Sequence, residues 1–386
     1  MIQRFSDESL NLSIAESLNC LVLLYVHVPF CARRCSYCDF AIAVRKSVPS
    51  DSFADDVISE WRRRITDPWW TQSPTVETVY FGGGTPSHVT PSALGRILDA
   101  VAAERSIHSA AEITIEANPD DITEANAREW RAIGINRVSL GVQSFAPAVL
   151  EWMHRTHTAE QVPDAFEILR AAGFRNISLD LIYGLPASLE RDWSADLDRA
   201  LELEPEHLSL YALTVESGTP LGKWTTRGSV IPLTDDRVAP EYIEANRRLV
   251  ERGFKHYEVS NAARPGFRAV HNAGYWRRVP FLGLGPSAHS GAGNERRWNL
   301  REYVAWREAL GAGRDPIEGT EVLDDDQVLM ERRYLGLRTD SGVGAELVPA
   351  DKRAIWVKEG WATEESARVR LTVEGWLRLD ALVASL

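Results

Sequence analysis

Six apolar, strand-like segments alternate with helical segments through the first 220 residues, and this alternation constrains the fold more than any other feature. The strand-like segments are 21–28, 75–81, 112–117, 137–142, 176–182 and 207–213. The helical patterns lie near 50–65, 91–103, 124–133, 159–171 and 189–203. Near-continuous apolar strands that alternate with helices are typical of a parallel sheet covered by helices. Because a closed barrel of this kind needs eight units, the pattern predicts an α/β fold with an open, partial (β/α)6 barrel.

The alternation of strands and helices fades after about residue 220, which predicts that the rest of the chain forms separate regions. A helix near 236–252, short β-type pieces such as 255–260 and Gly/Pro-rich turns indicate a connecting region at 221–315. From about Pro316 the chain is expected to turn helical, with a strand at 368–371 and then Thr372 as a helix N-cap. We therefore expect an N-terminal extension (1–20), a core (21–220), the connecting region and a small winged-helix-like module (316–386).

The charge balance and the longest apolar run exclude some functional classes. The chain of 386 residues has 43 Lys and Arg against 55 Asp and Glu, a net charge of −12, so binding to nucleic acid is not expected. The longest apolar run, 21–30, is about half the length that a membrane span requires. Acidic residues interrupt 1–20, so these residues lack the apolar core of a signal peptide. We expect a cytosolic protein with no membrane span and with reduced thiols.

Three of the four cysteines follow the first strand in the spacing C-x3-C-x2-C, at Cys31, Cys35 and Cys38. They stand at a strand's carboxyl end, where α/β folds place their ligands. Three thiolates on one loop can hold three irons of a cubane iron–sulfur cluster and leave the fourth iron open. A zinc site normally takes a second cysteine or histidine pair, which is not evident here, and inert thiols are the other alternative. Cys20 has no assigned role.

A glycine run follows the second strand, in the segment FGGGTPS with Gly82, Gly83, Gly84 and Thr85. Glycines let the backbone pass close to a ligand and present its N–H and C=O groups. A structural turn would explain one or two of these glycines. A phosphate-binding loop is a further alternative, but no Gly-Lys-[Ser/Thr] follows.

Single polar residues stand at or near the ends of the next strands. These are Glu116 in IEANP, Gln143 in GVQSF, Arg155 in RTH and Asp180 in LDLIYGLP. An aspartate inside an apolar strand is costly unless it is paired or bound to something. Each of these residues, taken alone, is explained equally well as a helix-capping or turn residue. Together they are expected to converge on the edge of the sheet where the cysteine loop lies.

These segments resemble, motif by motif, the radical S-adenosylmethionine (SAM) superfamily. Within it they are most similar to the group that contains oxygen-independent coproporphyrinogen III oxidase (HemN) and the haem chaperone HemW. The similarity covers about residues 21–310, with a weaker match in VEGWLRLDAL. It implies a [4Fe–4S] cluster on the three cysteines, with SAM on the open iron and the glycine backbone at the SAM amino group. It further implies that Glu116, Gln143, Arg155 and Asp180 hold the ribose, adenine and carboxylate of SAM, with Tyr25 beside the cluster.

Two departures separate this chain from the coproporphyrinogen oxidase branch. In the oxidase branch that this sequence resembles, a fourth cysteine stands two residues after the third. This chain has Phe40 at that position. The stretch before the first strand is also short. Both departures argue against decarboxylation of coproporphyrinogen.

A second signature, HNAGYW, begins at His271 and includes Tyr275 and Trp276. Imidazole is a common haem ligand, aromatic rings can cover a porphyrin, and the following Arg277 and Arg278 could pair with propionates. The alternative is a turn histidine whose aromatic neighbours belong to the core.

The HNxxYW pattern resembles that of the HemW branch. This resemblance implies a chaperone that binds haem and hands it to acceptor proteins. A porphyrinogen oxidase, a radical methyltransferase and a tRNA-modifying enzyme are the rival functions. The sequence leaves open whether SAM is cleaved, which protein accepts the haem, whether the haem is covalently held, and the oligomeric state.

Overall fold

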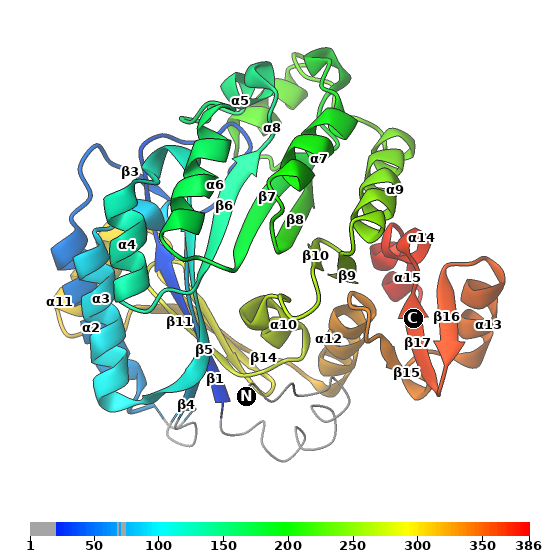
Figure 1. The fold of residues 1–386 in the computed structure, drawn as a ribbon. Coiled ribbons are helices and arrows are strands. Elements are labelled where there is room, and N and C mark those ends of the chain that lie inside the picture. The colour runs from blue at the N-terminus through cyan, green and yellow to red at the C-terminus, as the bar shows by residue number, and fades with distance from the viewer. Residues whose placement is uncertain (1–20, 68, 71–74) are drawn as a thin grey trace, which may run out of the picture.

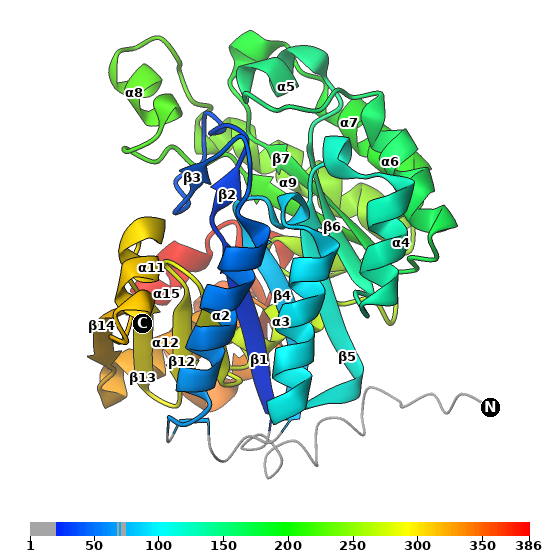
Figure 2. The same ribbon diagram turned by 90° about the vertical axis from the view of Figure 1, so that its left-hand side faces the viewer.

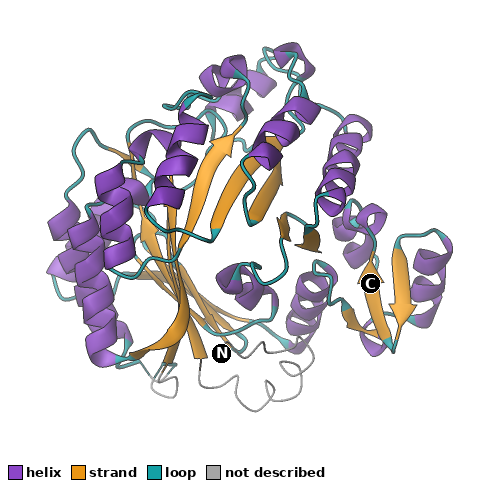
Figure 3. Ribbon diagram, in the orientation of Figure 1, coloured by secondary structure: helices purple, strands orange, loops and turns teal. Residues whose placement is uncertain are grey.

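The computed structural model describes residues 21–67, 69–70 and 75–386, so the predicted N-terminal extension with Cys20 lies outside the described residues. Six parallel strands form the centre of a large curved sheet (Figure 1 and Figure 3). In spatial order they are β1 (Leu21–Val28), β4 (Thr75–Gly83), β5 (Ser106–Ala117), β6 (Arg137–Gln143), β7 (Ile177–Tyr183) and β8 (His207–Ala212). All six predicted strands are present and adjacent in chain order, and among the described residues the sheet does not close, which confirms the partial (β/α)6 barrel.

Helices connect these strands and cover the outer face of the sheet (Figure 2). They are α2 (Ser50–Arg64), α3 (Pro91–Glu104), α4 (Glu124–Ala132), α6 (Gln161–Ala171) and α7 (Trp193–Glu202). Side chains of Thr90, Thr123 and Asp192 accept backbone N–H groups at the starts of α3, α4 and α7, as N-caps do. Two short helices, α5 (Pro147–Trp152) and α8 (Pro220–Thr226), lie beyond the carboxyl ends of the strands in Figure 1.

Later parts of the chain extend the sheet at both edges. Next to β1 follow β11 (Phe281–Leu284), β12 (His289–Ala292), β13 (Glu295–Asn299) and β14 (Ile317–Val322), with α11 (Tyr303–Gly311) before β14. Next to β8 follow β10 (Asn261–Ala263) and β9 (Lys255–Glu258), after helix α9 (Asp235–Glu251). The strand β11 continues the parallel pairing of β1, whereas β12 to β14 pair antiparallel.

One expectation is wrong at residue 316, where helix was expected. The first element there is the strand β14, which pairs with β13 at the edge of the large sheet. Its sequence, IEGTEV, is mostly polar and exposed, so it carries little strand signal of its own. The pairing partner decides its conformation, because strand preference depends on context.

The C-terminal part is a small helical unit with a three-stranded antiparallel sheet. Its helices are α12 (Asp325–Leu337), α13 (Ala350–Lys358), α14 (Val373–Trp376) and α15 (Leu379–Ala384). Its strands are β15 (Val343–Gly344), β16 (Ala362–Glu365) and β17 (Arg368–Leu371). The Thr372 side chain accepts the Gly375 N–H at the start of α14, so the predicted strand and N-cap are confirmed. The domain boundaries at 220 and 315 stay a prediction.

Short 3-10 helices complete the described chain, at η2 (Pro86–His88), η3 (Pro119–Asp121), η4 (Ala187–Leu189) and η5 (Ala345–Leu347). Helix α10 (Val270–Trp276), which carries the HNAGYW segment, lies on the inner side of the curved sheet in Figure 1 and contacts β4. A Cβ at Gly274 would meet the Leu23 side chain at 2.3 Å, so the glycine allows α10 to approach β1 closely. None of the helices in the described ranges has the length and apolarity needed to cross a membrane.

Candidate functional site

The cysteine loop is anchored at its base by a two-residue parallel ladder. Strand β2 (Phe30–Cys31) pairs with β3 (Ala43–Val44), so both ends of the loop are held beside the carboxyl end of β1 (Figure 2). The fully buried Phe30 ring packs edge-on against Phe53 and Tyr303, with ring centroids 5.3 and 5.0 Å apart. The core therefore fixes where the loop begins and ends.

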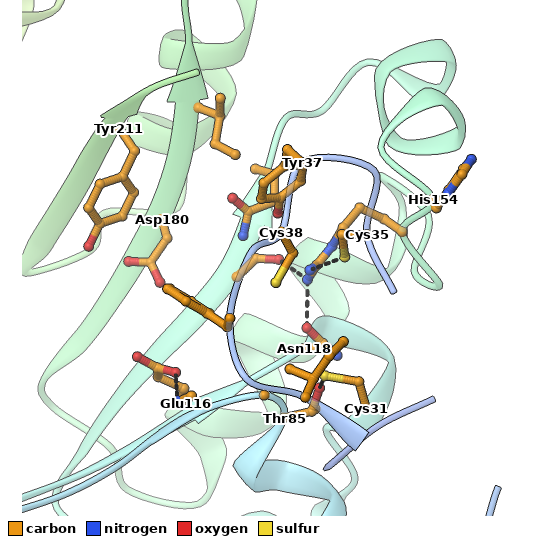
Figure 4. A pocket seen from close by; sticks show the side chains of 18 of the residues that line it. Cys31, Cys35, Tyr37, Cys38, Thr85, Glu116, Asn118, His154, Asp180 and Tyr211 are labelled. Carbon is orange, nitrogen blue, oxygen red and sulfur yellow. Dashed lines mark hydrogen bonds between the residues drawn. The ribbon is translucent and has the colours of Figure 1, made fainter. Parts of the chain in front are cut away.

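This loop forms one wall of a cavity of about 460 Å³ at the carboxyl ends of the parallel strands (Figure 4). The lining includes Cys31, Cys35 and Cys38. It also includes Gly83, Gly84, Thr85, Glu116, Gln143, Arg155 and Asp180. The structure thus brings these ten sequence-predicted residues together, because parallel strands present their carboxyl ends at the same edge.

The three cysteines are free thiols and partly accessible. Thr85 Oγ1 donates to Cys31 Sγ at 3.4 Å, and Arg155 Nη1 donates to Cys35 Sγ at 3.6 Å. Among the described residues, no three His, Cys, Asp or Glu side chains are already grouped as ligands of one metal ion. Burial raises the pKa of the Cys31 thiol to about 11, so binding of iron by this sulfur must release a proton.

Arg155 joins the cysteine loop to the ends of two strands. Its Nη2 donates to Asn118 Oδ1 at 2.5 Å and to the Gly141 carbonyl at 2.8 Å. Within the described chain its buried Nε has no hydrogen-bond partner. A Cβ at Gly141 would meet Gln143 Nε2 at 3.0 Å and Arg155 Nη2 at 3.2 Å. Gln143 itself has a positive φ of 68°, a strained conformation that is typical of functional sites.

Two carboxylates face the cavity from the other side, away from Cys31 and Cys35 (Figure 4). Glu116 accepts the Tyr80 hydroxyl at 2.8 Å and the Gly83 N–H at 3.0 Å, while burial raises the pKa of its carboxyl to about 7. Asp180 accepts Ser139 Oγ at 3.0 Å, and burial raises its pKa as well. The cavity wall thus combines a guanidinium with two carboxyl groups.

The glycine run serves packing as well as any ligand. A Cβ at Gly83 would meet the His27 ring at 2.6 Å, and a Cβ at Gly84 would meet the Phe30 carbonyl oxygen at 2.7 Å. A Cβ at Gly82, which does not line the cavity, would meet the Tyr80 ring at 2.8 Å. These glycines therefore let the end of β4 approach the cysteine loop.

A second cavity of about 450 Å³ adjoins the first. The two share Asp39, Phe40, Gly83 and Glu116 as lining. The second cavity is also lined by Tyr25, which the family resemblance implies lies beside the cluster, and by His27, Tyr275, Phe281, His289 and Arg301.

His271 lines neither of these two cavities, although the sequence analysis singled it out as a haem ligand. Its side chain is buried, with Nδ1 hydrogen-bonded to Thr78 Oγ1 at 2.6 Å and Nε2 to the Tyr275 hydroxyl at 2.8 Å. Burial lowers its pKa to about 3, so the ring is neutral at pH 7. The structure thus presents His271 as a hydrogen-bonded core residue.

The residues that follow His271 point in different directions. Tyr275 lines the second cavity, whereas the Trp276 ring lies under the Arg338 guanidinium, 4.3 Å from the ring centroid. Arg278, considered as a propionate partner, is paired with Glu331 at 2.5 Å. In this short segment, Tyr275 therefore forms part of a cavity wall, whereas Trp276 and Arg278 pack against residues of α12 and its C-terminal end.

Sequence reasoning missed several residues of the first cavity, including Tyr37, Asn118, His154 and Tyr211. Asn118 lies inside the IEANP segment and Tyr37 lies between two cysteines, so proximity to a motif could have identified both. Tyr211 follows no recognisable motif. The pairing of β8 beside β7 places it at the cavity.

Comparisons with known proteins agree with this geometry. Residues 25–200 match the Radical SAM superfamily. A protein of Mycobacterium tuberculosis named Heme chaperone HemW is 36% identical over 369 residues, which cover 94% of each chain. The Heme chaperone HemW of Lactococcus lactis is also 36% identical, over 83% of each chain.

The solved structure of coproporphyrinogen III oxidase (HemN) from Escherichia coli has a similar fold. Its TM-score is 0.79, with 21% sequence identity over 98% of this chain and 93% of the oxidase chain. The likeness at this identity shows the fold alone. The identity with the two bacterial relatives extends over most of both chains, well beyond the cysteine motif. The chain therefore belongs to the radical SAM superfamily and, within it, to the HemW family.

Proposed function

We propose that this protein is a haem chaperone, which binds haem and hands it to acceptor proteins in the cytosol. The observation that carries the proposal is the 36% identity over 94% of both chains with a Heme chaperone HemW. The HNxxYW segment, with Tyr275 on a cavity wall, supports it from the chain's own residues. The acceptor proteins are part of the proposal only as a class.

The first cavity fits an iron–sulfur cluster together with SAM. Cys31, Cys35 and Cys38 are three free thiols on one wall, and they are the residues that would hold the cluster. Three sulfur ligands leave one iron of a cubane without a protein ligand, and the cavity in front of the loop has room for a small molecule there. Bound together, the cluster and SAM supply one-electron chemistry.

The polar groups of the first cavity suit the parts of SAM. The Arg155 guanidinium, whose Nε lacks a partner among the described residues, can bind the SAM carboxylate. Glu116 and Asp180 present carboxyl oxygens that can accept the ribose hydroxyls. These residues bind and orient SAM, with Gln143 and the backbone at Gly83 and Gly84 beside them.

The proposal is tested by purifying the protein anaerobically and titrating it separately with hemin and with SAM. We expect iron and sulfide on the protein, binding of hemin with a new Soret band, and transfer of that haem to apomyoglobin as a model acceptor. A variant with Cys31, Cys35 and Cys38 all changed to Ala should lose the iron and sulfide. Protein that binds no hemin, or that never releases it to the acceptor, would rule out the chaperone function.

A further inference from the structure

A histidine that binds the iron of a haem needs a ring nitrogen with a free lone pair on the wall of a cavity. His271 does not meet this condition in the described structure, because its side chain is 1% exposed and both ring nitrogens are hydrogen-bonded. His27 lines the second cavity, but its Nδ1 is bonded to the Tyr25 hydroxyl at 3.2 Å and its Nε2 to the Ala41 carbonyl at 2.9 Å. Another histidine must be considered.

His289 lines the second cavity from the start of β12, and its side chain is exposed. Neither ring nitrogen has a hydrogen-bond partner among the described residues, and the ring stacks on Trp298, with centroids 6.0 Å apart and planes at 26°. Partial desolvation lowers the pKa of His289, which favours the neutral form of imidazole that can bind a metal. An imidazole held by stacking, with a free nitrogen, is prepared to bind a metal.

The backbone below this histidine is fixed by close packing of two strands. A Cβ at Gly283 would meet the His289 carbonyl oxygen at 2.2 Å, so only glycine allows β11 and β12 to approach as they do. The Gly283 N–H donates to Ser290 Oγ at 3.0 Å, directly beside His289. The ring is thus carried by a strand that is paired on both sides, with β11 and with β13, and not by a loose loop.

Aromatic side chains make the second cavity suitable for a flat apolar ligand. Tyr25, Phe40, Tyr275 and Phe281 line it, and the Tyr275 and Phe281 rings meet edge to face at 4.8 Å. The Phe40 side chain is 59% exposed, so its ring is accessible to a ligand in this cavity. The cavity volume of about 450 Å³ lies within the range of small-molecule and cofactor sites, about 300–1,000 Å³.

One side of the second cavity carries a positive charge that can pair with the propionate carboxylates of a porphyrin. The exposed Arg301 lines the cavity and donates through Nη2 to the Asp39 carbonyl at 2.8 Å, which leaves other N–H groups for a propionate. Asp39 and Glu116 are acidic residues, and both belong to the wall shared with the first cavity. Propionates would therefore point toward Arg301 and away from the shared wall.

We propose that haem binds in the second cavity with His289, and not His271, as the protein ligand to iron, and with Arg301 as a propionate partner. This inference rests on the proposed haem-binding function and deepens it by naming the site. Because Phe40, Gly83 and Glu116 line both cavities, the haem would lie directly beside the SAM-binding cavity. His271 would then act through Tyr275, as a residue that positions the cavity wall.

The test compares three histidine variants of the full chain in hemin titrations followed by absorbance and electron paramagnetic resonance. His289→Ala should lose the Soret band and spin state of imidazole-ligated haem, and free imidazole should restore them. His271→Gln should keep the spectrum of the unchanged protein. His108→Ala, an exposed histidine on β5 that lines neither cavity, is the matched control and should also keep it.

The outcomes separate this inference from the proposed function. If the unchanged protein binds hemin while His289→Ala keeps the full spectrum, His289 is not the ligand and the chaperone proposal survives. Loss of the spectrum in His271→Gln with unchanged thermal unfolding would return the ligand role to His271. If the unchanged protein binds no hemin, the proposed function itself fails. As a second measurement, Arg301→Gln should weaken hemin binding while leaving the spectrum of the bound form unchanged.

Discussion

The Tyr275 hydroxyl lies 2.8 Å from Nε2 of His271, and only the tyrosine of this pair reaches the second cavity. On the other side of the same imidazole, Thr78 Oγ1 lies 2.6 Å from Nδ1. A chain of three side chains therefore runs from the buried part of β4 through α10 to the cavity wall. His271 therefore lies behind the wall of the second cavity, where its hydrogen bond supports Tyr275.

Removing the hydroxyl of Tyr275 should reveal this support. We expect Tyr275→Phe to lower the free energy of unfolding by about 1 kcal/mol, because a buried imidazole nitrogen loses its partner. Chemical denaturation measures the difference. Tyr303→Phe is the matched control, since the buried Tyr303 hydroxyl has no hydrogen-bond partner among the described residues and its loss should cost little. Equal effects of the two changes would contradict the role of the Tyr275–His271 pair.

The ionisation of Glu116 should make stability depend on pH. Burial raises the pKa of this carboxyl to about 7 in the folded state, so the folded form holds its proton more tightly than the unfolded chain does. Stability from this group is present below about pH 4.5 and is lost as the pH rises toward 7. We expect Glu116→Gln to remove this loss, and up to about 3 kcal/mol of the pH dependence with it.

Thermal unfolding between pH 5 and pH 8 measures this effect as the difference between variant and unchanged protein. The difference should move in favour of Glu116→Gln as the pH rises. Glu167→Gln, at an exposed position on α6, provides the control and should show no such trend. A constant difference across the pH range for Glu116→Gln would show that the carboxyl is already ionised in the fold at low pH.

A methyl group at Gly84 should disturb the cysteine loop. Its Cβ would lie 2.7 Å from the Phe30 carbonyl oxygen and 2.9 Å from that of Val28, and backbone atoms cannot move aside cheaply. We expect Gly84→Ala to cost about 1–3 kcal/mol of stability. We also expect it to lower the iron and sulfide retained after anaerobic reconstitution. Gly218→Ala is the control, because a Cβ there meets nothing within 4 Å; a similar iron loss in both variants would refute the steric argument.

Replacing Arg155 by Lys should weaken SAM binding although the charge is kept. The guanidinium contacts Asn118, the Gly141 carbonyl and Cys35 at once, and an ammonium group cannot reproduce these directions. We expect Arg155→Lys to weaken SAM binding at least roughly tenfold, or about 1.4 kcal/mol. Anaerobic calorimetry checks this on protein with a measured cluster content. Arg128→Lys, on the exposed face of α4, should leave SAM affinity unchanged; equal losses would place the effect outside the site.

Much of the core and its main site could be predicted because their signals are local. The apolar runs of β1 and of β4 to β8, and the helical patterns between them, lie in short stretches, and parallel pairing then aligns the carboxyl ends of the strands. The spacing of Cys31, Cys35 and Cys38 after a strand that ends just before Pro29 similarly needs only a few neighbouring residues. The first cavity follows from these local facts together with the topology of α/β sheets.

The sequence by itself determined which segments of the first 220 residues would form the six parallel strands and the helices between them, and which thiols would share one loop. Tertiary structure alone decided that His271 turns into the core while Tyr275 faces a cavity, although four residues separate them on one helix. It also decided that His289 comes near Tyr25 and Phe40, and that Ile317–Val322 becomes an edge strand. The physical reason is that these outcomes depend on contacts between segments far apart in the chain, which leave no periodic pattern in either segment.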